Sequence, residues 1–394
     1  MNRRDFLVRA STLALGGLLP AGCAIAPKTG PSGGSTAGQT VVLIELNGGN
    51  DGLNTVVPYT DPKYYELRPK LAVAKTDVLR LNDTLGFNPA LKALQPVWDK
   101  GELAVVLGTG YPQPNRSHFR SIEIWDTGSN SDEFADEGWL ARYFALRRLS
   151  RPSAAADGVV FGRPYVGPMV GTNARVVVLD DPATFARQAR QVQMPGGVGA
   201  NPALEHVMRV QAEAKAAGAD IEKNLARMNI KTEFPRSGIG GQMRNAARLV
   251  ASGLDIPVVK VSQGGFDNHS FQRTTHDRLL REVAEAMTAF RLAMIESGMW
   301  DRVLVMTYSE FGRRPAENRS EGTDHGTAAP HFIMAPRIKG GFHGRQPALT
   351  DLADGDLKHT VDFRSVYATV LNRWWGVESA PVLGRAHAEV GFLV

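Results

Sequence analysis

The stretch that decides the fold is Val41-Val42-Leu43-Ile44, which is followed by Asn47-Gly48-Gly49-Asn50-Asp51-Gly52. A continuous run of β-branched and aliphatic residues is typical of a strand that is buried on both faces. The loop after it consists of residues that tolerate unusual backbone angles. A buried strand that ends in such a loop indicates an α/β protein.

Strand and helix patterns alternate from this point to the C-terminus. We expect further strands at 103–107, 175–179, 256–261, 303–306 and 331–334, and helices at 117–125, 139–149, 201–228, 242–252, 275–296 and 361–375. This alternation predicts an α/β fold, a doubly wound, mostly parallel sheet with helices on both faces. Residues 40–394 are expected to form a single domain, with 180–240, the part least like strands, as a helical insertion.

The first 26 residues have the features of an export signal. Arg3 and Arg4 are followed by Phe6 and a mildly apolar run at 11–19, which resembles a twin-arginine signal peptide. The run is too short for a transmembrane helix, which needs about 20 apolar residues. We therefore expect 1–26 to be a signal peptide read by the twin-arginine translocase and 27–39 to be a flexible linker.

The mature protein is expected in the periplasm or outside the cell. Residues 24–26 have the form of a cleavage site, whereas 19–23 are close to a lipoprotein box, so the membrane is expected as a partner only through a lipid anchor at Cys23. Both ways of processing remain open.

Composition excludes several classes of protein. The 394 residues are 43% hydrophobic and 22% charged, which excludes a disordered chain, a collagen-like repeat and a multi-span membrane protein. A net charge of +5 is too small to predict a nucleic-acid partner. Cys23 is the single cysteine, so an intrachain disulfide and a thiolate metal site are both excluded.

Polar side chains of the kinds that bind metals follow four of the predicted strands. Ligands of open α/β sheets gather at the carboxyl ends of the strands. The loops there contain Asp51, Ser117, Asp267, His269, Glu310 and Arg313, with Asp324 and His325 shortly beyond. Carboxylates mixed with imidazoles favour a divalent metal ion, namely zinc, manganese, magnesium or calcium.

Each of these residues also has a structural interpretation. Asp51 could simply stabilise a turn, and Ser117 could be only the N-cap of the helix that follows it. Asp267 and His269 point the same way in an extended segment, as chelation requires, but a surface hydrogen bond would look identical. The convergence of several strands at one edge favours a functional site more than any single motif does.

Five motifs together resemble domain-of-unknown-function family 1501. They are Asn47-Gly-Gly-Asn-Asp51-Gly-Leu-Asn-Thr, Arg116-Ser117-His118-Phe119, Gly264-Gly-Phe-Asp267-Asn-His269, Ser309-Glu310-Phe-Gly-Arg313 and Gly322-Thr-Asp324-His325-Gly326. The resemblance runs from about Thr40 to the C-terminus. The family is thought to belong to the alkaline phosphatase and sulfatase superfamily, which implies a doubly wound fold and a metal site.

The resemblance implies a role for each matched position. Ser117 falls where the nucleophile sits, and Arg313 is a candidate to bind the oxygens of an anionic ester. Metal ligands are expected at Asp51, Asp267, His269, Glu310, Asp324 and His325. Phe311 stands where a metal-binding histidine is usual, so the ion shared by Asp51 and Glu310 could be lost, or could use His118 or Asp324 instead.

These roles imply an exported metal-dependent hydrolase of phosphate or sulfate esters with a serine nucleophile. Its partner would be an anionic small-molecule or polymer ester. Two alternatives remain: a non-catalytic, metal-stabilised binding protein of the cell envelope, and a one-metal hydrolase that uses activated water.

Overall fold

The computed structural model describes residues 38–150, 156–172, 174–179, 221 and 223–393. The predicted signal peptide, most of the linker, the cysteine and most of the predicted 180–240 insertion lie outside the described residues. Within that insertion, residues 221 and 223–227 are helical.

Strand β1 (Thr40–Leu46) lies in the interior of a nine-stranded sheet, and all seven of its residues are buried. It pairs in parallel with β8 (Val258–Gln263) on one side and with β9 (Val303–Tyr308) on the other. The strand order is β11-β5-β10-β9-β1-β8-β6-β7, and β14 also pairs with β5. The remaining strands are β5 (Leu103–Gly110), β6 (Gly158–Phe161), β7 (Val176–Leu179), β10 (Ala329–Met334), β11 (Gly341–His343) and β14 (Val361–Asp362).

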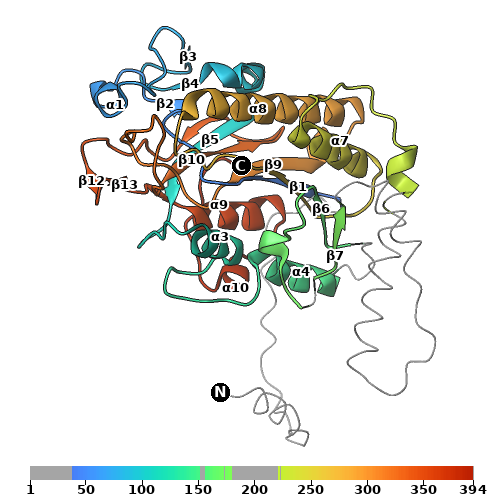
Figure 1. The fold of residues 1–394 in the computed structure, drawn as a ribbon. Coiled ribbons are helices and arrows are strands. Elements are labelled where there is room, and N and C mark those ends of the chain that lie inside the picture. The colour runs from blue at the N-terminus through green and yellow to red at the C-terminus, as the bar shows by residue number, and fades with distance from the viewer. Residues whose placement is uncertain (1–37, 151–155, 173, 180–220, 222, 394) are drawn as a thin grey trace, which may run out of the picture. The chain divides into compact units, whose positions relative to one another are not determined.

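Helices cover both faces of this sheet (Figure 1). On one face α7 (Gly238–Ala251) and α8 (Gln272–Glu296) pack with η1 (Pro89–Leu94) and α2 (Gln95–Asp99) around apolar residues such as Ile44 and Phe290. On the other face α3 (His118–Thr127), α4 (Trp139–Ser150), α9 (Phe363–Thr369) and α10 (Ala380–Leu383) pack around Leu43, Trp139 and Tyr367. The predicted doubly wound, mostly parallel sheet is confirmed.

Smaller elements lie beside the main sheet. A three-stranded sheet of β2 (Val56–Val57), β4 (Gly86–Phe87) and β3 (Leu79–Arg80) follows the loop that contains Asp51, and α1 (Pro62–Leu67) lies within the same segment. The other short elements are η2 (Gly167–Met169), η3 (Trp300–Arg302), β12 (Leu352–Ala353) and β13 (Asp356–Leu357). In the part of the chain that the structure describes, no helix is both long and apolar enough to cross a membrane.

Two elements differ from the sequence expectation. Strand β10 runs antiparallel to both of its neighbours, β5 and β9, which its apolar pattern alone did not reveal. The predicted helix at 361–375 begins with a strand instead, because Val361 and Asp362 pair with β5. Asp362 then caps α9 by accepting a hydrogen bond from the Arg364 backbone (2.9 Å), and the helix continues into a π-helical turn, η4 (Val370–Trp374).

Candidate metal centre

The carboxyl ends of β1, β5, β8 and β9 lie at the same edge of the sheet. The loop before β10 lies at this edge too, because β10 is antiparallel and therefore begins there. The loops are joined through their backbones: Phe266 N donates to Asn47 O (3.2 Å), and Arg313 forms a β-bridge with His325. The edge thus gathers residues that are far apart in the sequence.

Asp267 is the residue on which the imidazoles converge. Its Oδ1 lies 2.9 Å from His269 Nε2 and 3.1 Å from His325 Nε2, and its Oδ2 lies 3.4 Å from His118 Nε2. The Nε2 atoms of His269 and His325 are 3.1 Å apart. Ligand atoms of His118, Asp267 and His325 all lie within 4.8 Å of one another, which is close enough for one metal ion to bind all three.

The second nitrogen of each imidazole has its own partner. His118 Nδ1 lies 3.0 Å from Glu310 Oε1, His325 Nδ1 lies 2.9 Å from the Arg116 carbonyl, and His269 Nδ1 lies 3.5 Å from Asp324 Oδ1. Partners of this kind fix a histidine so that Nε2 is free to bind a metal. Glu310 and Asp324, which the sequence predicted as ligands, therefore contact the Nδ1 atoms of His118 and His269, on the side of each ring away from Asp267.

The carboxylate of Asp267 is kept ionised by its neighbours. Burial raises the pKa of Asp267, but hydrogen bonds from Arg313 and His325 outweigh it and hold the pKa below its usual value. The hydrogen bond to Glu310 is the largest effect on His118 and raises its pKa. A negative oxygen and three imidazole nitrogens at one point form a donor set that suits zinc or manganese.

Phe311 packs against two of the imidazoles. The phenyl ring is buried and lies 4.5 Å from the His325 ring and 5.0 Å from the His118 ring, measured between centroids. It therefore contacts two imidazoles at the position where the sequence resemblance led us to expect a histidine. His118 brings a third imidazole to Asp267 from the start of α3, a residue that the sequence allowed as a ligand without counting it among the site residues.

Arg313 connects the loops around Asp267 through hydrogen bonds. It is buried, and its nitrogens donate to the carbonyls of Gly49 (2.8 Å), Thr323 (2.9 Å) and Gly48, and to Asp267 Oδ1 (2.7 Å). Because these acceptors use all three guanidinium nitrogens, the side chain is not directed at an incoming anion. Its geometry is that of a residue that positions Asp267.

Asp51 is held by a different set of contacts. Its carboxylate is buried and pairs with Arg68 Nη1 (2.7 Å) and with the Gln272 side chain (2.5 Å). Burial raises the pKa of Asp51, but the charges of Arg68 and His276 and the hydrogen bonds from Arg68 and Gln272 together outweigh it, so the pKa is lowered and the carboxyl stays ionised. The structure thus places Asp51 in an ion pair with Arg68, while an ion shared by Asp51 and Glu310 stays a prediction.

Ser117 lies directly before His118 at the exposed start of α3. It occupies the N-cap position, yet its hydroxyl makes no capping hydrogen bond. The first intrahelical bond runs from Ser121 N to Ser117 O (2.9 Å), so the preceding N–H groups of the helix are not used within it. A hydroxyl without a capping hydrogen bond, next to the N–H groups of a helix N-terminus, can bind an anion.

Two glycines allow the loops to approach one another. A Cβ on Gly322 would lie 2.2 Å from the carbonyl carbon of His269, and one on Gly48, where φ is +114°, would lie 2.4 Å from Asp267 N. Any other residue at either position would push the Asp267 loop away. The glycine-rich motifs therefore set the spacing of the site.

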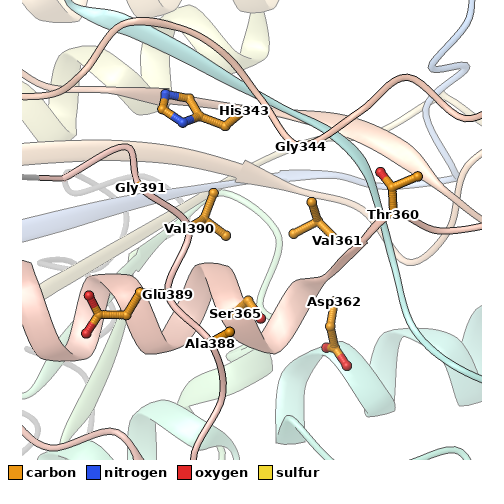
Figure 2. Close-up of a pocket in the computed structure, with 10 residues that line it drawn as sticks. All are labelled: His343, Gly344, Thr360, Val361, Asp362, Ser365, Ala388, Glu389, Val390 and Gly391. Carbon is orange, nitrogen blue, oxygen red and sulfur yellow. The ribbon is translucent and has the colours of Figure 1, made fainter.

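A separate cavity of about 360 Å³ lies next to α9 (Figure 2). It is lined by His343 and Gly344, by residues 360–362 and Ser365, and by the C-terminal segment at 388–391. None of the sequence-predicted site residues lines it.

The chain belongs to the family of proteins of unknown function DUF1501, whose family model matches residues 38–384. None of the curated proteins is detectably similar to it. The family assignment agrees with the five motifs that the sequence contains.

Among solved structures, the chain is similar to three proteins of 9–12% identity. One is a protein in the alkaline phosphatase superfamily from Vibrio parahaemolyticus (12% identity, TM-score 0.40, covering 88% of this chain and 69% of that chain). Another is the phosphonate monoester hydrolase of Agrobacterium radiobacter (11%, 0.38, 89% and 78%). The third is the lipoteichoic acid synthase LtaP from Listeria monocytogenes (9%, 0.37, 78% and 68%). These similarities are distant.

Proposed function

We propose that this protein is an exported, metal-dependent hydrolase of phosphate or sulfate esters. The observation that carries the proposal is the convergence of three Nε2 atoms on Asp267, directly beside the N-terminus of α3. The substrate is an anionic small-molecule or polymer ester.

A divalent ion would be held by Asp267, His118, His269 and His325. The fit rests on the donor set itself, because each imidazole presents one nitrogen to the centre and has its other nitrogen fixed by a protein acceptor. Such an ion would supply Lewis-acid stabilisation of negative charge. Arg313 and Phe311 hold Asp267 and the imidazoles in position.

Ser117 is the proposed nucleophile. Its oxygen would form a bond to the phosphorus or sulfur of the ester while the bond to the alcohol oxygen breaks, and the alcohol oxygen takes up a proton. Water would then release phosphate or sulfate and restore the serine. The free N–H groups at the start of α3 would bind the non-bridging oxygens of the anion.

A second candidate is a hydrolase that uses activated water and one metal ion, with no serine intermediate. The ion pair between Asp51 and Arg68 favours it, because a carboxylate committed to an arginine is not available for a second ion. The state of Ser117 during turnover distinguishes the two candidates.

The experiment uses the full chain purified without chelators and loaded with zinc or manganese. It is given an aryl phosphate, a phosphodiester and an aryl sulfate, quenched in acid and analysed by mass spectrometry of the peptide that contains Ser117. We expect turnover of at least one ester and the mass gain of one phosphoryl or sulfuryl group on that peptide. Ser117→Ala should abolish both.

Turnover that survives in Ser117→Ala would favour the water-activating hydrolase. Absence of turnover in the metal-loaded wild type, with all three ester types, would overturn the proposal. Ser131→Ala is the matched control, because Ser131 is a partly exposed serine whose hydroxyl donates to the Gln113 carbonyl (2.5 Å) and should not affect the reaction.

A further inference from the structure

Two phenylalanines beside the candidate metal centre are almost fully exposed to solvent. Among the described residues, four large apolar side chains are more than three-quarters exposed: Phe119 (89%), Leu149 (86%), Phe134 (79%) and Phe271 (77%). Phe134 is covered by the guanidinium of Arg120, which lies 3.9 Å from its ring centroid. Phe119 directly follows His118, and Phe271 comes two residues after His269.

The backbone at Phe271 is strained, which singles it out from an ordinary exposed residue. Its φ of 44° and ψ of 43° lie in the left-handed region, which is rare for a bulky side chain. The conformation is imposed by bonds from Phe271 N to Ser320 O (2.9 Å) and from Gln272 N to Glu321 O (2.9 Å). A large exposed side chain kept in a strained conformation next to a site is a sign of function.

Both phenylalanines belong to segments that also carry a histidine of the candidate metal centre. His118 and His269 approach the two oxygens of that carboxylate at 3.4 Å and 2.9 Å. Consecutive Cα atoms are about 3.8 Å apart, so the backbone of each phenylalanine is no more than roughly 8 Å from that of its histidine. Phe119 lies in the first turn of α3 and Phe271 is the N-cap of α8, so the two side chains come from different elements, and Asp267 lies between the two histidines that they follow.

We propose that Phe119 and Phe271 form an aromatic rim that stacks against a ring of the substrate. This inference rests on the proposed function, since the ring would be attached to the ester that binds at Asp267. It narrows the substrate to anionic esters of ring-bearing alcohols, which present a flat apolar face that a phenyl ring can cover.

The test compares stable anions that differ in the ring. Phenylphosphonate, a pyranosyl methylphosphonate and methylphosphonate are titrated by calorimetry into the zinc- or manganese-loaded chain. We expect the wild type to bind at least one ring-bearing anion about tenfold more tightly than methylphosphonate, since one aromatic stacking contact has about this value. Which ring is preferred identifies the alcohol as an aryl or a sugar group.

Phe119→Ala and Phe271→Ala should each reduce that preference severalfold and leave methylphosphonate binding unchanged. Phe271→Tyr should keep the preference, and Leu149→Ala is the control for loss of exposed apolar surface. Equal binding of all three anions to the wild type, or an unchanged preference in both alanine variants, would contradict the proposed aromatic rim but not the proposed function. If no anion binds, the proposed function fails and the rim fails with it.

Discussion

At the scale of single residues, His118 is held between two carboxylates of the site. Its Nε2 faces Asp267 and its Nδ1 faces Glu310, so one imidazole connects the two carboxylates. The raised pKa of His118 means that a proton competes with a metal ion for this ligand at a higher pH than for an ordinary histidine.

This competition leads to a prediction about the pH of metal release. Glu310→Gln keeps an oxygen acceptor for His118 Nδ1 but removes the charge that favours the protonated ring. We expect the midpoint of metal release to move to lower pH, measured by equilibrium dialysis with zinc between about pH 5 and 8. His343→Ala, a histidine beside the other cavity, should leave the midpoint unchanged.

The ligands themselves can be tested in the same measurement. Asp267→Asn, His118→Ala and His325→Ala should each weaken zinc binding by at least tenfold, whereas Asp51→Asn should not change the number of ions bound. Loss of an ion in Asp51→Asn, or full binding in both histidine variants, would contradict the assignment.

Asp126 is a second residue whose charge is set by its surroundings. It is fully buried on the α3 face of the sheet, where burial raises its pKa to about 8. Its Oδ2 accepts a hydrogen bond from the Tyr165 hydroxyl (2.6 Å), and its Oδ1 has no partner among the described residues. The folded protein therefore binds a proton here that the unfolded chain releases above about pH 4.

The linkage predicts that stability falls as pH rises between about 4 and 8, because in this range only the folded state keeps the proton of Asp126. Asp126→Asn removes the ionisable group and with it this loss of stability at neutral pH. We expect the free energy of unfolding at pH 7 to increase by about 2 to 4 kcal/mol and at pH 4 to change little. Urea unfolding at both pH values measures this difference, and Asp83→Asn, at an exposed position, is the control. An equal change in the free energy of unfolding of Asp126→Asn at both pH values would contradict the linkage.

At the scale of elements, the start of α8 carries strain that a substitution can remove. Phe271 is the N-cap of α8 in a left-handed conformation, which costs about 1 kcal/mol or more for any residue with a Cβ. Phe271→Gly should therefore stabilise the metal-free protein by roughly 0.5 to 1 kcal/mol, after the greater freedom of glycine in the unfolded chain is subtracted.

Thermal and urea unfolding of the variant measure this gain. Phe119→Gly is the matched control with the opposite sign, because Phe119 lies in the helical first turn of α3 and glycine there should destabilise by up to about 1 kcal/mol. A lower stability in Phe271→Gly would mean that its ring makes contacts that outweigh the strain.

The sequence predicted the elements better than it predicted their directions. The runs at 41–44 and 303–306 are apolar throughout, so a buried strand was the consistent interpretation and both lie within observed strands. The direction of β10 depends on the chain reversal between Arg313 and Ala329, which leaves no periodic pattern. It is this reversal that brings His325 to the site.

The site was predicted in part for the same reason. Asp267, His269 and His325 could be assigned to one edge because each follows or precedes a recognisable strand. The ion pair of Asp51 with Arg68 joins positions in a region of short elements, where spacing carries little information on side-chain contacts. The loss of a histidine at Phe311 was the one signal in the sequence that pointed to His118.

At the scale of the whole molecule, the fold bears on the proposed export route. The site needs loops that lie far apart in the sequence and meet at one edge of the sheet, so it exists only when the domain is complete. A twin-arginine signal would allow the protein to cross the membrane after folding and metal loading. We expect Arg3→Lys with Arg4→Lys to retain the precursor in the cytoplasm, because the paired guanidinium groups are what such signals require.

Cell fractionation followed by immunoblotting measures this retention. Arg9→Lys is the matched control, since it makes the same change outside the pair and should be exported normally. Undiminished export of the double variant would contradict the route.

The place of β1 in the sheet also has a consequence during translation. The Thr40 hydroxyl donates a hydrogen bond to the Ile256 carbonyl, which is 216 residues further along the chain. The second partner strand, β9, is synthesised later still. A ribosome needs roughly 10 to 45 s to synthesise that distance. Throughout this time the apolar strand has no neighbour to pair with, so ribosomes that stall before β8 would release fragments prone to aggregate.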